Sequence, residues 1–203
     1  MANSENKEFQ DFIKRLMKGA SDVYFRDVIE ISTGQKVLEV DGKYLEIVSK
    51  IKDFLNFKLK EISAIVERNY KGRANELGNF IEDVLIKYLR MIKGFSTKRT
   101  IGYPDIDLDA NGEHIYIECK IYQTKTINSS LRTFYFKVSY KSGVKHTCPH
   151  ILIGFEVKSL GGKNKSPFVV NSFKIVDLYE LKVNLKPEFN ASNPMVYKNC
   201  KNL

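Results

Sequence analysis

The 203-residue chain lacks any apolar run near the ~18–20 residues that a membrane-spanning helix needs. Its first ten residues, MANSENKEFQ, do not form the apolar core of a signal peptide. Only three cysteines are present, Cys119, Cys148 and Cys200, and their spacing fits no disulfide framework. We therefore expect a soluble cytoplasmic protein with reduced thiols and no contact with a membrane.

Several catalytic and metal-binding motifs are also missing. The chain has no GxSxG motif, no P-loop and no GxGxxG after a predicted strand. His146, Cys148 and His150 lie close together in HTCPH, but no CxxC pair accompanies them, so we do not expect a zinc site there. Cys119 lies inside a predicted buried strand, which indicates a small core residue rather than a nucleophile.

Acidic residues are missing from one long segment. Residues 1–120 hold 20 Lys or Arg and 20 Asp or Glu, whereas residues 121–203 hold 13 and 4, so the second part carries the whole net charge of +9. Residues 121–150 contain no acid at all. Such asymmetry favours a polyanionic partner, and the alternative is a solvated basic surface. The basic residues of this segment are Lys125, Arg132, Lys137, Lys141 and Lys145.

Hydrophobic periodicity predicts helices first and strands later. Apolar residues at three- and four-residue steps predict amphipathic helices at about 7–18, 43–67 and 75–92. Alternation or short apolar runs predict strands at 133–141, 151–157 and 168–176, and Asp177 is placed to begin a short helix over 177–182.

This order predicts an α/β (α+β) fold in which helices flank a mixed β-sheet. We expect a single domain over residues 1–203. Within it, residues 1–70 form a helical region for packing or dimerisation, and residues 75–180 form the core of the domain.

The most informative stretch is residues 101–122, where an Asn-Gly signal at 111–112 predicts the turn of a β-hairpin. The turn places Asp105 and Glu118 level across the hairpin, at roughly the ~5 Å spacing of a cross-strand pair. Carboxylates that close repel each other, and a hard divalent cation bound through oxygen removes the repulsion. Lys120 projects from the same face as Glu118, where it can orient a water or stabilise negative charge on phosphorus.

The hairpin contains the pattern PD-x12-ECK, and a predicted helix that carries a glutamate precedes it. This pattern resembles the PD-(D/E)xK nuclease superfamily, above all its type II restriction endonucleases, over roughly residues 75–157. The resemblance implies a restriction-endonuclease-like core in which Asp105 and Glu118 bind Mg²⁺. It also implies that the backbone carbonyl of Cys119 is a further ligand and that Lys120 is the catalytic lysine.

Two of these residue assignments, the helix glutamate and the first metal ligand, have an alternative candidate. Many members of the superfamily carry a helix glutamate four residues after a glycine, which matches Glu82 in GNFIE, and Glu76 competes with it. Asp105 directly follows the proline and is preferred over Asp107 as the first metal ligand. We expect Asp109, nearest the turn, to be solvated.

Residues 129–156 resemble the basic and aromatic region that follows the catalytic strand in several restriction endonucleases. In that setting the five basic residues of the acid-free segment contact phosphates or base edges, and a bidentate arginine such as Arg132 can read guanine. Their alternative is again a set of solvated cations.

The resemblance therefore implies a prokaryotic, Mg²⁺-dependent type II restriction endonuclease. It is expected to act as a homodimer on double-stranded DNA, because two sites can cut both strands of a palindrome. The expected products carry 5′-phosphate and 3′-hydroxyl ends. The alternatives are a repair or recombination nuclease of the same superfamily, such as a junction resolvase, and a non-catalytic DNA-binding protein.

Overall fold

The computed structural model describes residues 8, 10–15, 18–123, 134, 136, 143–162 and 165–185. The chain divides into two compact units, residues 24–181 and, separately, residues 1–23 with 182–203. In the smaller unit, strand β1 (Ala20–Tyr24) pairs with strand β8 (Lys182–Leu185). No helix in the described ranges is long and apolar enough to cross a membrane.

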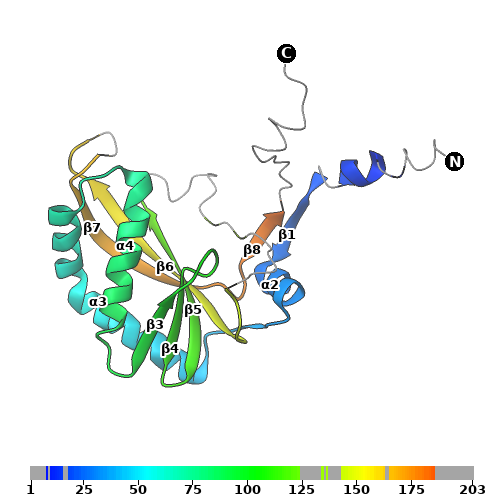
Figure 1. Ribbon diagram of the computed structural model, residues 1–203, viewed down its shortest axis with the longest axis horizontal. Coiled ribbons are helices and arrows are strands. Elements are labelled where there is room, and N and C mark those ends of the chain that lie inside the picture. The colour runs from blue at the N-terminus through cyan, green and yellow to red at the C-terminus, as the bar shows by residue number, and fades with distance from the viewer. Residues whose placement is uncertain are drawn as a thin grey trace, which may run out of the picture. The chain divides into compact units, whose positions relative to one another are not determined.

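The larger unit is built on a mixed sheet (Figure 1). Its strands run in the order β2-β6-β5-β4-β3, and β7 lies beside β6. The β5–β6 and β2–β6 pairs are parallel, and the other pairs are antiparallel, which confirms the predicted mixed sheet. The elements of this unit are α2 (Phe25–Thr33), β2 (Val37–Leu38), α3 (Gly42–Asn69), α4 (Ala74–Leu89), β3 (Phe95–Arg99), β4 (Ile106–Ala110), β5 (Glu113–Tyr122), β6 (Cys148–Ser159) and β7 (Phe168–Asp177).

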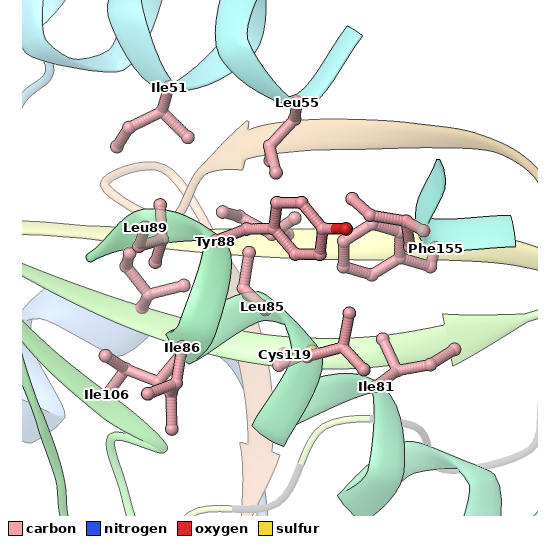
Figure 2. Close-up of a cluster of buried hydrophobic side chains, with 14 of the residues drawn as sticks. Ile51, Leu55, Ile81, Leu85, Ile86, Tyr88, Leu89, Ile106, Cys119 and Phe155 are labelled. Carbon is pink, nitrogen blue, oxygen red and sulfur yellow. The ribbon is translucent and has the colours of Figure 1, made fainter. Parts of the chain in front are cut away.

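Helices α3 and α4 agree with the predicted helices and bury their apolar stripes on one face of the sheet. Figure 2 shows Leu85 and Tyr88 of α4 beside Leu55 of α3, with Ile106 and Cys119 of the sheet in the same cluster. A fully buried leucine such as Leu85 contributes about 1.5–3 kcal/mol relative to an exposed one. This core fixes α4 against β4 and β5, and thereby fixes the functional side chains that those elements carry.

The opposite face of the sheet is covered in part by α2, a helix that the sequence patterns do not predict. Its first residue, Phe25, is fully buried and lies edge-on to Tyr103, with ring centroids 5.3 Å apart, and to His150, with centroids 6.1 Å apart. Because side chains alternate along a strand, Tyr116 and Glu118 point to this face while Ile117 points to the helices.

Three predictions at the ends of the chain and after the hairpin have different outcomes. The described residues of the predicted 7–18 helix are helical. The predicted helix over 177–182 is wrong: a turn leads into β8, and the Asp177 carboxylate instead accepts hydrogen bonds from the backbone N–H groups of Val40 (2.9 Å) and Tyr179 (3.0 Å). The predicted strand over 133–141 lies outside the described residues, apart from its positions 134 and 136.

Candidate active site

The hairpin of β4 and β5 has the predicted register. Both turn residues have positive φ, 57° for Asn111 and 91° for Gly112, which is the backbone that a tight Asn-Gly hairpin turn requires. Ile106 pairs with Ile117, so Asp105 comes level with Glu118. Asp105 Oδ2 accepts a hydrogen bond from the backbone N–H of Cys119 at 2.8 Å, which fixes the carboxylate at the end of the ladder.

Lys120 lies between the two acids. Its Nζ is 2.5 Å from Glu118 Oε1 and 3.5 Å from Asp105 Oδ2. Burial opposes the charge on Lys120, but Glu118 and Asp105 outweigh it and raise the pKa of the lysine. The structure therefore brings together the two acids and the lysine that the sequence pattern selects, with the lysine protonated.

Glu118 is the most deeply buried member of this group, with 4% of its surface exposed. Burial raises its pKa to about 7, the charge of Asp105 adds to the rise, and Lys120 opposes it. Glu118 Oε2 is buried and, within the described part of the chain, has no hydrogen-bond partner. A buried carboxylate oxygen without a partner, next to a second acid, fits a hard divalent cation, because such ions bind through oxygen.

The backbone of Cys119 also suits a metal site. In a strand, the N–H and C=O of one residue point to the same side, so the Cys119 carbonyl faces the side on which its N–H meets Asp105. The Cys119 side chain is buried in the core, and burial holds the pKa of its thiol well above its usual range. The thiol is therefore unsuited to act as a nucleophile, in agreement with the core role expected for it.

Of the two helix glutamates, Glu82 lies near the acid pair. Glu82 is 8% exposed, and burial followed by the charge of Asp105 raises its pKa. Arg99 Nε contacts Glu82 Oε1 at 2.8 Å and holds the carboxylate in place. Glu76 is exposed and lies beside Tyr70, whose pKa is raised by burial and by the Glu76 charge.

The remaining acids of the strand face have other partners. Asp107 Oδ1 lies 2.8 Å from His114 Nδ1. Asp109 Oδ1 accepts a hydrogen bond from the N–H of Gly112 at 2.6 Å and so stabilises the turn. Asp105 is thus the acid of this strand that the structure brings together with Glu118.

The structure describes one of the five basic residues that are expected to contact DNA. Lys125, Arg132, Lys137 and Lys141 lie outside the described residues. Lys145 is described and exposed.

Lys98 of β3 is a basic residue on the sheet face that carries the acids, and the sequence patterns do not single it out. It is exposed and pairs across the ladder with Asp107. Only the strand register reveals this position, because β3 is not predicted as a strand.

A buried aromatic pair borders the acids. Tyr103 Oη lies 2.7 Å from His150 Nδ1. Burial, and then the charge of Glu118, holds the pKa of Tyr103 well above its usual range. Burial also lowers the pKa of His150 to about 3, so both groups are neutral near pH 7. The neutral side chains of Tyr103 and His150 border Glu118 and give its carboxylate no charged partner, which helps to explain why that carboxylate is poorly solvated.

A mixed sheet flanked by helices, with two acids and a lysine on its central hairpin, is the architecture of a restriction-endonuclease-like nuclease. The chain belongs to the type II restriction enzyme MjaV family, whose sequence profile matches residues 18–200. It is similar to the type II restriction enzyme MjaV of Methanocaldococcus jannaschii, with 32% identity over 216 aligned residues that cover 95% of this chain and 92% of that protein.

Proposed function

We propose that the protein is a Mg²⁺-dependent endonuclease that cleaves double-stranded DNA at a specific sequence and leaves 5′-phosphate and 3′-hydroxyl ends. The observation that carries the proposal is the buried Glu118 Oε2, which lacks a partner among the described residues and lies beside Asp105 and Lys120. Membership of a type II restriction enzyme family supports the DNA substrate.

Asp105, Glu118 and the backbone carbonyl of Cys119 are the groups that would hold the ion. All three are oxygen donors, which Mg²⁺ prefers. When bound, Mg²⁺ supplies positive charge against the phosphoryl oxygens and acidifies water. Glu82 assists from α4, where Arg99 contacts its carboxylate and the charge of Asp105 contributes to its raised pKa.

Lys120 is the residue that positions the attacking water. Its ammonium group bridges Asp105 and Glu118 in the structure, and Lys120 would be free to turn toward the substrate once those two acids held the ion instead. Water attacks phosphorus in line with the bond to the 3′ oxygen, and that bond breaks. The 3′ oxygen takes up a proton, and the phosphate stays on the 5′ end.

The proposal extends to the assembly. Two copies of the chain form a homodimer whose two sites cut both strands of a palindromic sequence. Residues 75–180 act as the catalytic core of one nuclease domain, and the five basic residues of the acid-free segment contact the duplex in the prokaryotic cytoplasm. Light scattering should give twice the mass of one chain.

The test is digestion of a long mixed-sequence linear duplex with Mg²⁺ and, in parallel, with EDTA. The proposal predicts discrete fragments with Mg²⁺ only, and the fragments should be rejoined by DNA ligase, which requires 5′-phosphate and 3′-hydroxyl ends. Cleavage restricted to branched DNA would instead identify a junction resolvase. Salt-sensitive DNA binding without any cleavage would identify a non-catalytic binding protein.

A further inference from the structure

A second cluster of ligand-bearing side chains lies beside the acid pair on the same sheet. Asp107, His114 and His146 each offer one ligand atom, and these atoms all lie within 4.8 Å of one another. We propose that these three residues form a second metal site, which binds Zn²⁺ or a similar transition-metal ion and is separate from the Mg²⁺ site. Two imidazoles and one carboxylate leave a fourth position for water, as in many zinc sites.

The two sites use different carboxylates. The Asp105 carboxylate engages the Cys119 N–H and Lys120, whereas the Asp107 carboxylate engages His114. Asp107 is two residues along from Asp105, which corresponds to ~6.6 Å at the usual rise of a strand. Neither site therefore takes a side chain from the other.

The ligand types select the class of ion. Imidazole suits Zn²⁺ and its neighbours in the first transition row, whereas Mg²⁺ favours carboxylates, carbonyls and water. Asp107 Oδ1 and His114 Nδ1 are hydrogen-bonded at 2.8 Å, whereas two ligands held at 2.0–2.1 Å around a tetrahedral ion lie ~3.3 Å apart, so an ion would replace the shared proton and move the two atoms apart by roughly 0.5 Å. His146 has to close the remaining distance.

His146 can do so by turning its ring. The His114 and His146 rings stack with centroids 3.7 Å apart and planes 9° apart. A lone pair on an imidazole nitrogen lies in the ring plane, so parallel rings cannot both point at one ion, and one ring has to rotate. Both side chains are only partly buried, so neither ring is enclosed in the core.

The backbone that carries the ligands is well fixed. Asp107 and His114 lie on adjacent strands and share a face, two register positions apart. Residues 143–147 are tied to the sheet through Tyr116, whose Oη accepts hydrogen bonds from the N–H groups of Lys145 (2.7 Å) and His146 (3.0 Å). Tyr116 is fully buried.

An ion at this site would clamp residues 143–147, which lead into β6, onto the hairpin of the acid pair. Its role is structural: it would brace β4 two residues from Asp105 and hold the end of the acid-free segment in place. Such an ion stabilises the folded state, because the ligands come together only there.

The experiment uses the full chain, stripped with EDTA and then supplied with excess Mg²⁺ to fill the hard-cation site. Zn²⁺ is titrated by calorimetry, and Co²⁺ is followed by its visible absorption. We expect one equivalent to bind and to raise the melting temperature. His114→Gln and His146→Gln should each weaken Zn²⁺ binding by at least ~100-fold. Loss of a residue that only supports a metal ligand already weakens binding by up to about 100-fold, and loss of a direct ligand should cost no less.

Asp109→Asn is the matched control, since Asp109 pairs with His114 across the ladder but offers no ligand to the cluster. It should leave Zn²⁺ affinity unchanged. The chain has three histidines, and His150 is fully buried with its Nδ1 occupied by Tyr103, so a histidine-type Co²⁺ spectrum would come from the other two.

Retention of wild-type Zn²⁺ affinity by both His114→Gln and His146→Gln would overturn the second site. If Asp105→Ala then loses that binding, the ion lies at the acid pair. Because the readout is metal binding in the presence of Mg²⁺, failure here leaves the nuclease proposal intact. Failure of DNA cleavage likewise leaves this site testable.

Discussion

Glu118→Gln should make the metal-free protein more stable while it abolishes Mg²⁺ binding at the acid pair. The Glu118 carboxylate has a pKa of about 7 against an ordinary value of 4.5, because it is buried beside Asp105. Each unit of pKa is worth about 1.4 kcal/mol, so the charged carboxylate destabilises the fold by about 3 kcal/mol at pH 8. Glutamine has nearly the same shape and carries no charge.

The contact with Lys120 is already included in this shift, because Lys120 opposes the rise in the pKa of Glu118. We therefore expect Glu118→Gln to raise the free energy of unfolding by about 3 kcal/mol at pH 8. Burial decides the sign, since the desolvation of Glu118 exceeds what its contact with Lys120 returns.

The pH dependence of the stability gain shows whether the raised pKa of Glu118 is its cause. A folded-state pKa above the ordinary value means that the folded wild type binds an extra proton between pH 4.5 and about 7, so its stability falls as the pH rises through that window. Glutamine has no proton to lose. The advantage of Glu118→Gln should therefore be present at pH 8 and absent at pH 4.5.

The assay is urea unfolding in EDTA at both pH values. Glu113→Gln is the control with the opposite sign, because Lys43 lowers the pKa of the partly exposed Glu113 and the loss of this contact should destabilise the protein. A Glu118→Gln variant that is less stable than wild type at pH 8, or whose advantage does not change with pH, would refute the reasoning.

Three further predictions concern the lysine, the buried histidine and the core. Lys120→Ala should slow cleavage by about 10²–10⁴-fold, the usual contribution of a positioned proton-transfer group, while filter binding to the duplex in EDTA is retained. His150 has a pKa of about 3 against an ordinary 6.5, so the unfolded chain binds a proton that the folded chain cannot. The free energy of unfolding should therefore fall by about 3 kcal/mol between pH 7 and pH 4.5. In denaturant titrations, His150→Phe should remove this part of the loss of stability in acid. Leu85→Ala, at a fully buried position, should cost 2–5 kcal/mol of unfolding free energy, roughly, whereas Ile31→Ala, at a position 86% exposed, should cost less than about 0.5 kcal/mol.

The sequence patterns predict the parts of the fold that depend on local signals. The Asn-Gly turn alone fixes the hairpin register, and the register places Asp105 level with Glu118 and Lys120 beside both. The long apolar stripes of α3 and α4 likewise need no knowledge of their partners.

The features that the sequence patterns do not predict depend on contacts between residues that are far apart in the sequence. Helix α2 is stabilised through Phe25, whose aromatic neighbours Tyr103 and His150 lie far along the chain. In the sequence, Asp177 has the position of a helix cap, but in the fold its carboxylate accepts a hydrogen bond from the distant Val40 N–H instead. His114 and His146 become neighbours only when the segment before β6 folds onto the sheet.

The central claim is that Asp105, among the three acids of its strand face, serves the nuclease reaction. The most direct test measures the cleavage rate of a duplex that contains the mapped site, under single-turnover conditions with saturating Mg²⁺, for wild type, Asp105→Asn and Asp109→Asn. Asp105→Asn should abolish cleavage, and Asp109→Asn, which keeps an oxygen for the Gly112 N–H, should cut at the wild-type rate. Discrete fragments that persist in Asp105→Asn would contradict the account.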